Sequence, residues 1–337
     1  MIDILVAGGG PAGLAAAIRA ATAGLEAVVV EPRPAPVDKA CGEGIMPSGV
    51  AALRALGVTP VGSELRGIRY VEGARQAQAA FRGHPGLGVR RTELHSALHR
   101  RARELGVRLV TGRAEEVRQG DGTVTTAGLT ARWLIAADGL HSPLRRALGL
   151  ERPCAAPRRY GLRRHYRVAP WTDHVEVHWS REGEAYVTPV GEELVGVAVL
   201  SRHRRSHEQH LSAFPALARR LRGLEAGPVR GAGPLRQTAG APRAGRVLLA
   251  GDAAGYVDAL TGEGIALAAA TASAAVDCLA AGRPEAYPAH WARLTRRHRL
   301  LTGALLGAAG HPLTAGLIVP AAHRLPALFR VAVHALQ

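Results

Sequence analysis

The hydrophobic pattern of the 337-residue chain begins with two short apolar runs separated by an alanine-rich stretch. Residues 2–7 are almost entirely apolar and end at a glycine, which is typical of a buried parallel strand. Residues 14–24 contain no proline and end in glycine, which predicts a helix with a glycine after its last turn. Residues 27–30 predict a second buried strand that ends at Glu31. The N-terminus therefore reads as one βαβ unit.

The periodicity changes twice further along the chain. Apolar residues recur at helical spacing in residues 92–105, and residues 47–56 and 266–280 also predict helices. Alternating patterns with Gly-Glu turns between residues 160 and 200 predict an antiparallel sheet. Further strands are expected at residues 67–70, 76–81, 107–111, 123–126, 133–136, 174–179, 195–200 and 246–250.

These changes predict a discontinuous organisation. One domain is expected to comprise residues 1–68, 88–155 and 234–290, and a second, substrate-facing domain residues 69–87 and 156–233. Residues 291–337 are expected to form C-terminal helices. Residues 301–323 carry no Asp, Glu, Lys or Arg, but Pro312, Pro320 and several glycines interrupt them. We therefore expect a pair of short helices there rather than a membrane span.

Composition narrows the class of protein. A hydrophobic fraction of 47% with 21% charged residues indicates a globular chain. The net charge of +16 comes almost entirely from arginine, since Lys39 is the only lysine. These arginines are scattered with few aromatics among them, so nucleic acid is not the expected partner. A peripheral contact with an anionic membrane stays open as an alternative.

Cysteine usage and the N-terminus bear on the compartment. The three cysteines lie far apart, without metal-binding spacing, so neither a metal site nor a disulfide framework is expected. The first strand is expected to begin at residue 2, so no signal peptide is expected. We expect a cytoplasmic protein, with membrane association as the alternative. No feature of the sequence specifies an oligomeric state.

The chemistry begins with a glycine loop between the first strand and helix, Gly8-Gly9-Gly10-Pro11-Ala12-Gly13. In this spacing the first glycine permits a tight turn, the second admits a pyrophosphate to the backbone, and the third packs the helix on the strand. The helix N-terminus then offers free amides to phosphates. Glu31 ends the next strand, where a carboxylate accepts ribose hydroxyls. The sequence predicts a dinucleotide site, but this unit alone does not separate NAD from FAD.

Two later segments favour FAD. Predicted strands end at Asp138-Gly139 and at Gly251-Asp252, and strand ends of this kind lie at the carboxyl edge of a parallel sheet. Asp252 there would accept a hydrogen bond from the ribityl chain of a flavin. The helix that starts near Gly262 and Gly264 would aim its amides at the electron-rich end of the isoalloxazine ring.

This ordered set of motifs resembles the group A flavoprotein monooxygenase superfamily over most of the chain. The nearest branch is that of the geranylgeranyl reductase-like proteins, because residues 39–44 and 251–265 are similar to its Lys-x-Cys-Gly-x-Gly loop and Gly-Asp-Ala-Ala-Gly run. Several bacterial polyketide-pathway oxidoreductases look similar. The resemblance implies that Glu31 binds the adenine ribose and Arg91 contacts FAD. It implies that Asp138 serves FAD and transient NAD(P)H, and that Asp252 holds the ribityl chain.

The residues expected around the cofactor are Gly8, Gly10, Pro11, Ala12, Gly13, Glu31, Pro32, Lys39, Cys41, Gly42, Arg91, Asp138, Gly251, Asp252, Gly262, Gly264 and Ile265. Lys39 independently supports a cofactor-binding role for the loop of residues 39–44, because a single lysine among many arginines favours a position where arginine does not fit.

Catalytic candidates are fewer and weaker. They are Cys41, His165 and Tyr186. A thiol near a cation would have a lowered pKa, which suits reactivity, but for Cys41 the favoured interpretation is a small buried residue packed under the flavin. The reductase branch carries a Tyr-x-Trp-x-Phe-Pro stretch, of which residues 184–189 keep only Pro189, with Tyr186 in place of the tryptophan.

We therefore expect an α/β fold, in which a discontinuous Rossmann-like FAD-binding domain of the glutathione-reductase type is combined with an antiparallel substrate sheet and a helical C-terminus. The expected function is that of an NAD(P)H-dependent monooxygenase that hydroxylates or epoxidises an apolar aromatic or polyketide-type molecule. The alternatives are a geranylgeranyl reductase-like enzyme that reduces carbon–carbon double bonds and an electron-transfer flavoprotein.

Overall fold

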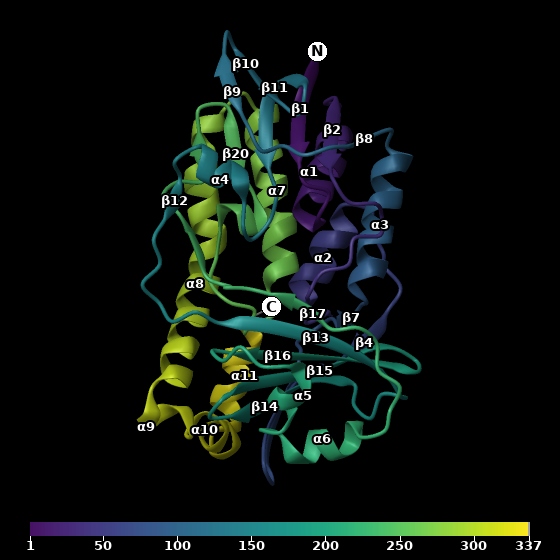
Figure 1. Cartoon of the computed structure of the whole chain (residues 1–337), viewed down its shortest axis with the longest axis vertical. Helices are drawn as coiled ribbons and strands as arrows, with labels where there is room; N and C mark the ends of the chain where they lie inside the picture. Colours follow the sequence, from purple (N-terminus) through teal and green to yellow (C-terminus); the bar gives the residue numbers. More distant parts are fainter. Residues whose placement is uncertain (336–337) are drawn as a thin grey trace.

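The computed structural model describes residues 1–335, so residues 336–337 of the predicted C-terminal segment lie outside the description. Two sheets divide the molecule (Figure 1). A mainly parallel sheet with helices packed on it occupies the upper half of the view, and a seven-stranded sheet crosses the lower half. The combination confirms the expected α/β class.

The parallel sheet holds the predicted N-terminal unit at its centre. Its strands run in the order β20-β11-β1-β2-β8, and all four neighbouring pairs are parallel. The bounds are β1 (Ile2–Ala7), β2 (Ala27–Glu31), β8 (Arg108–Thr111), β11 (Leu129–Ala136) and β20 (Val247–Leu249). Three antiparallel strands extend it, β9 (Arg118–Gly120), β10 (Thr123–Thr126) and β19 (Arg243–Ala244). The predicted strands of this half are confirmed.

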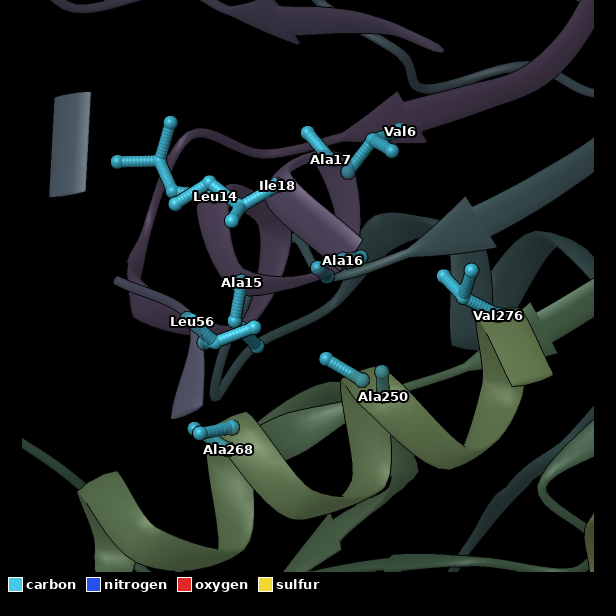
Figure 2. Packing of buried hydrophobic residues seen from close by; sticks show 14 of the residues in the cluster. Val6, Leu14, Ala15, Ala16, Ala17, Ile18, Leu56, Ala250, Ala268 and Val276 are labelled. Carbon is cyan, nitrogen blue, oxygen red and sulfur yellow. The ribbon is translucent and has the colours of Figure 1, made fainter. Parts of the chain in front are cut away.

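Helices cover one face of this sheet. They are α1 (Pro11–Thr22), α2 (Pro47–Ala55), α3 (Arg91–Glu104) and α7 (Gly264–Ala280), and they share one apolar core with the sheet. Helix α1 begins three residues earlier than predicted, because Gly10 is extended and Pro11 starts the first turn. Figure 2 shows Ala15 and Ala16 of α1 in the layer between this helix and α7. These small side chains allow the two helices to pack closely.

The second sheet runs in the order β17-β13-β16-β15-β14-β5-β6. Its strands are β5 (Gly67–Glu72), β6 (Arg75–Ala80), β13 (Tyr160–Arg167), β14 (His174–Ser180), β15 (Gly183–Gly191), β16 (Leu194–Ser201) and β17 (Arg230–Ala232). The strands predicted between residues 160 and 200 pair antiparallel with one another, as expected, whereas β14 and β5 form a parallel pair. No hairpin joins these two strands, which come from distant parts of the chain, so no short turn fixes their direction. The expected domain limits stay a prediction.

Short elements fill the remainder. Two three-stranded sheets comprise β3 (Gly44–Ile45), β4 (Ser63–Leu65) and β7 (Gly86–Gly88), and β12 (Glu151–Arg152), β18 (Gln237–Ala239) and β21 (Gly255–Tyr256). The short helices are α4 (Pro143–Ala147), α5 (His207–Leu211), α6 (Pro215–Leu221) and the 3-10 turns η1 (Gly251–Ala254) and η2 (Pro284–Ala286). Helices α5 and α6 share an apolar cluster with the seven-stranded sheet.

The prediction of a pair of short helices at residues 301–323 is wrong for its first part. Residues 301–310 do not form a separate short helix, because they continue the 24-residue helix α8 (Tyr287–Gly310). That helix ends where His311 turns extended ahead of Pro312, as residues before proline tend to do. Helices α9 (Pro312–Ala315), α10 (Ile318–Arg324) and α11 (Pro326–His334) follow. In the described chain no single helix is long and apolar enough to cross a membrane, although one bent helix pair at residues 284–324 meets the length and composition test.

Candidate cofactor and substrate site

A cavity of about 730 Å³ lies where the carboxyl ends of the parallel strands face the seven-stranded sheet. Of the residues expected around the cofactor, all except Gly13 and Gly251 line this cavity. These two glycines instead allow neighbouring segments to pack closely. A side chain at Gly13 would collide with the Gly8 carbonyl at 1.8 Å, and one at Gly251 would approach Ala12 to 2.7 Å. The predicted residues are therefore brought together, while the binding roles assigned to them stay predictions.

The glycine loop has the geometry of a phosphate cradle. Gly8 adopts a φ of 101°, and a side chain there would meet the Ala137 carbonyl at 2.5 Å. Gly10 has no atom within 4 Å of where a side chain would begin, so its backbone faces open space in the cavity. No side chain caps helix α1, so the amides of its first turn are available to an anion.

The next strand end supplies the expected carboxylate. Glu31 accepts a hydrogen bond from the Gly9 amide at 2.8 Å and pairs with Arg33, whose Nε lies 2.6 Å from Oε1. Burial favours protonation of Glu31, but the hydrogen bonds from Arg33 and Gly9 outweigh it and lower the pKa. The group is therefore an anion, which suits a hydrogen-bond acceptor for ribose.

Sequence reasoning missed a histidine that braces this loop. His95 on α3 is buried, and its Nε2 lies 3.0 Å from the Gly9 carbonyl. Burial, together with nearby Arg91, lowers the pKa of His95 to about 4. The imidazole is therefore neutral at neutral pH and donates its Nε2 proton to the carbonyl. A histidine on a helix gives no signal of this contact, because Gly9 is 86 residues away in the chain.

Arg91 provides the clearest sign of an absent anionic ligand. Its side chain is only 5% exposed and lines the cavity, yet its Nη1 has no hydrogen-bond partner among the described residues. Burial lowers the pKa of Arg91, because a charged guanidinium is less stable away from water. A buried guanidinium without a partner is costly unless a ligand supplies an anion.

The two predicted aspartates lie at the same sheet edge. Asp138 accepts a hydrogen bond from the Leu144 amide at 3.1 Å, while its other oxygen has no partner in the described chain. Burial raises the pKa of both Asp138 and Asp252. At Asp252, the positive charges of Lys39 and Arg91 oppose this effect. Both carboxyl groups line the cavity, and in the described chain Asp138 keeps one oxygen free to accept a hydrogen bond.

Arg145, which follows the Asp-Gly motif, holds these strand ends together. Its side chain is fully buried and donates to the Ala253 carbonyl at 3.1 Å and to the Leu140 carbonyl at 3.0 Å. It also contacts Gln237 at 2.9 Å. Arg145 does not line the cavity, so we assign it a structural role.

The loop that contains the single lysine closes one side of the cavity. Lys39 lies beside Gly139, with Nζ 3.2 Å from where a side chain at that glycine would begin. Cys41 also lines the cavity, and the lowered pKa that would make it a reactive thiol is not found. Burial and the Glu43 carboxylate raise the pKa instead, so the thiol keeps its proton. Lys39 and Glu43 each lie two residues from Cys41 in the sequence, but the sequence does not show that the Cys41 thiol and Glu43 are buried.

Glu43 is the main functional residue that the motif did not single out. It is 2% exposed and adopts a φ of 61°, a conformation that is uncommon for a residue with a side chain. Its Oε1 accepts the Arg91 amide at 2.8 Å, and its Oε2 lies 2.7 Å from His165 Nε2. Arg163 donates to the other nitrogen of His165, so His165 carries its proton on Nε2 and donates it to Glu43. A buried network thus ties the loop to strand β13 and helix α3.

The N-terminus of α7 completes the polar end. Gly262, Gly264 and Ile265 line the cavity, and no side chain caps the helix. Gly262 has a φ of 70°, which favours glycine. The first amides of α7 therefore point toward the cavity, as expected for the seat of an electron-rich ring.

The wall of the cavity formed by the seven-stranded sheet is apolar. It is formed by side chains that alternate along adjacent strands of the seven-stranded sheet, namely Ile68, Tyr70, Val175, Val177, Tyr186, Ala198 and Leu200. Tyr186 donates its hydroxyl hydrogen to the Leu260 carbonyl at 3.2 Å. Burial raises its pKa well above the ordinary value, so it stays protonated. Of the three catalytic candidates, Cys41 and Tyr186 line the cavity, whereas His165 lies behind Glu43.

These features fit FAD. The glycine cradle, the Glu31 carboxylate and the unpartnered Arg91 suit its adenosine diphosphate half, and the α7 amides suit its ring. The fold and the site define an FAD-dependent oxidoreductase. Comparison with known families agrees, since the model of the FAD binding domain family matches residues 1–287. The chain belongs to this family, within the group A flavoprotein monooxygenase superfamily, and its cofactor is FAD.

Individual relatives are reductases by name. The chain is 32% identical to a menaquinone reductase of Mycolicibacterium smegmatis, over 88% of this chain and 80% of the relative. It is 29% identical to digeranylgeranylglycerophospholipid reductase 1 of Methanopyrus kandleri, over 78% of this chain and 76% of the relative. The structure of a flavoprotein/dehydrogenase from Cytophaga hutchinsonii superposes with a TM-score of 0.82 at 18% identity, covering 99% and 92% of the two chains. The geranylgeranyl reductase-like resemblance is therefore confirmed.

Proposed function

We propose that the protein is an FAD-dependent reductase that saturates a carbon–carbon double bond in an apolar, prenyl-type chain, with NAD(P)H as the electron donor. The observation that carries this proposal is the division of one cavity into a nucleotide-binding end and a hydrocarbon end. The seven side chains of the seven-stranded sheet that form the apolar wall of the cavity include no charged group. The names of the relatives, a menaquinone reductase and a digeranylgeranylglycerophospholipid reductase, support this class of substrate.

The reaction adds two electrons and two protons to the substrate: NAD(P)H supplies both electrons and one proton as it becomes NAD(P)⁺, and the second proton comes from a protein group that solvent recharges. Bound FAD supplies the redox chemistry, since it accepts two electrons from the donor and passes them on. The protein's part is to seat both molecules, to exclude water and to hold a proton. The Cys41 thiol and the Tyr186 hydroxyl both face the cavity with raised pKa values, so each retains the proton that such a step needs.

A monooxygenase that acts on an apolar aromatic or polyketide-type molecule is the second candidate. The stretch at residues 184–189 favours it, because this part of β15 lacks two of the aromatic residues of the reductase branch. Tyr186 there turns its hydroxyl to the Leu260 carbonyl. Both candidates share the same cofactor seat and differ in what the substrate gains.

Product mass separates the candidates. We would incubate the holoenzyme with NADH or NADPH and a short-chain prenylated quinone in detergent, with and without oxygen. The reductase adds two hydrogen atoms and works without oxygen, whereas the monooxygenase adds one oxygen atom and requires it. Reduction of an artificial acceptor with no change in any substrate would instead indicate an electron-transfer flavoprotein.

A cysteine pair tests the proton donor. Cys41→Ala should lower kcat on the prenylated quinone without loss of bound FAD. Cys154→Ala is the matched control, because Cys154 is also a free cysteine but is exposed. Equal kcat values for the two variants would remove Cys41 from the reaction and leave Tyr186 as the candidate.

A further inference from the structure

Apolar side chains gather on the outer surface of the C-terminal helices. Six of the nine exposed large hydrophobic residues in the described chain lie between residues 300 and 331. They are Leu300, Leu313, Leu317, Leu325, Leu328 and Val331, each more than half exposed. In Figure 1, α9 and α10 lie together beyond the lower end of α8, on the far side of the molecule from the N-terminus. We call these six side chains the outer apolar surface.

Packing within the protein does not account for this surface. On α11, Phe329 and Val333 are buried against the seven-stranded sheet, and they satisfy the inward face of the helix. Leu328 and Val331 point elsewhere and remain exposed. A helix that is apolar on both faces is typical of one that has a second apolar environment. An exposed cluster of this kind marks an interaction site.

The charge around the surface indicates what covers it. Residues 286–337 contain no Asp or Glu, and Arg324 and Arg330 lie among the apolar residues of this surface, while four further arginines occupy the earlier turns of α8. Arg202, from the end of β16, also lies against the end of α8, because its guanidinium sits where a side chain at Gly310 would be. A symmetric dimer through this surface would bring two such basic patches together, and they would repel each other. An anionic lipid headgroup layer instead complements both the arginines and the leucines.

The same helices back the apolar end of the cavity. Tyr70 lines the cavity, and its ring packs on Phe329 of α11 with centroids 4.7 Å apart. Val319, Phe329 and Val333 belong to one apolar cluster with the cavity residues Val177 and Tyr186. A bilayer in contact with the outer apolar surface would therefore lie close to the hydrocarbon end of the site.

We propose that helices α9–α11 and the end of α8 seat the protein on an anionic bilayer surface, from which a lipid substrate enters the cavity. The identity of the substrate rests on the proposed function, whereas the docking itself does not. The leucines would enter the boundary between headgroups and acyl chains, and Arg324 and Arg330 would contact the headgroups.

Vesicle co-sedimentation of the holoenzyme tests the docking. The vesicles are phosphatidylcholine alone or phosphatidylcholine mixed with phosphatidylglycerol. We expect binding to the mixed vesicles that weakens with added salt. Leu325→Ser/Leu328→Ser should weaken it by about tenfold or more, since each leucine loses apolar burial. Arg324→Gln/Arg330→Gln should weaken it by about tenfold or more on mixed vesicles only, at about fivefold per charge.

The matched control is Val61→Ser/Val229→Ser, which removes exposed apolar residues from other parts of the molecule. FAD content and thermal unfolding establish that each variant is folded. The proposal is overturned if the wild type does not bind mixed vesicles, or if the leucine variant binds them as tightly as the control. It is also overturned if the leucine variant instead converts a dimer to a monomer in sedimentation velocity.

Activity in detergent keeps this test separate from the proposed function. The leucine variant should reduce a short prenylated quinone in detergent as fast as the control while failing to bind vesicles. Absence of that activity in every form of the enzyme would refute the proposed reductase and leave the vesicle result standing.

Discussion

Arg91→Met should act in opposite directions on the apoprotein and on FAD binding. Methionine preserves the length and packing of the side chain, and the Arg91 amide can still donate to Glu43 because that contact is made by the backbone. The substitution removes the guanidinium of a residue that is 5% exposed and whose Nη1 has no hydrogen-bond partner in the part of the chain that the structure describes. If FAD supplies an anion that pairs with Arg91, the buried guanidinium destabilises the apoprotein but not the holoprotein.

The structure sets the size of both effects. An unsatisfied buried polar group costs about 1–3 kcal/mol, and more when it is charged, so the apoprotein should be unchanged or more stable. A hydrogen bond to a charged group contributes about 1.5–3 kcal/mol, so the Kd for FAD should rise about ten- to a hundredfold. Because FAD stabilises the protein by mass action, the difference in Tm between the holoprotein and the apoprotein should shrink.

The assay is fluorescence titration of the apoprotein with FAD, combined with denaturant unfolding. Arg90→Met is the matched control, since Arg90 is the exposed neighbour that precedes the same helix. The reasoning fails if the FAD affinity of Arg91→Met equals that of the control. It also fails if the apoprotein loses as much stability as the holoprotein, because Arg91 would then be a structural brace.

Two further changes test the residues around the loop. Glu43→Gln leaves one oxygen for two donors, the Arg91 amide and His165. The free energy of unfolding, measured by denaturant titration, should therefore fall by about 1.5–3 kcal/mol. A loss equal to that of the exposed control Glu225→Gln would show that the buried network does not stabilise the protein. His95 has a pKa of about 4 in the folded protein against an ordinary 6.5, so between these pH values the unfolded chain binds the extra proton and stability should decrease as pH falls. His95→Gln should flatten that slope, and exposed His84→Gln should not; equal slopes in the two variants would remove His95 from the pH dependence.

The nucleotide half of the protein could be predicted from the sequence because its signals are local. The roles of Gly8, Gly10 and Gly13 follow from a spacing of six residues between one strand and one helix. Strand ends fix where Glu31 and Asp252 lie, since the carboxyl ends of parallel strands share one edge. These residues do line the cavity, apart from Gly13, which packs against Gly8.

The tertiary structure decided what depends on contacts between distant segments. The pKa of Cys41 rises chiefly because the fold buries the thiol, and neighbouring Glu43 adds to the rise, although Lys39 lies equally near in the sequence. Glu43 meets His165 across 122 residues, and no periodicity records such a contact. Likewise, β5 lies parallel to β14 because side-chain packing rather than a turn sets that pair. Local spacing fixes backbone conformation and strand ends, whereas burial and charge at a site depend on which segments fold against it.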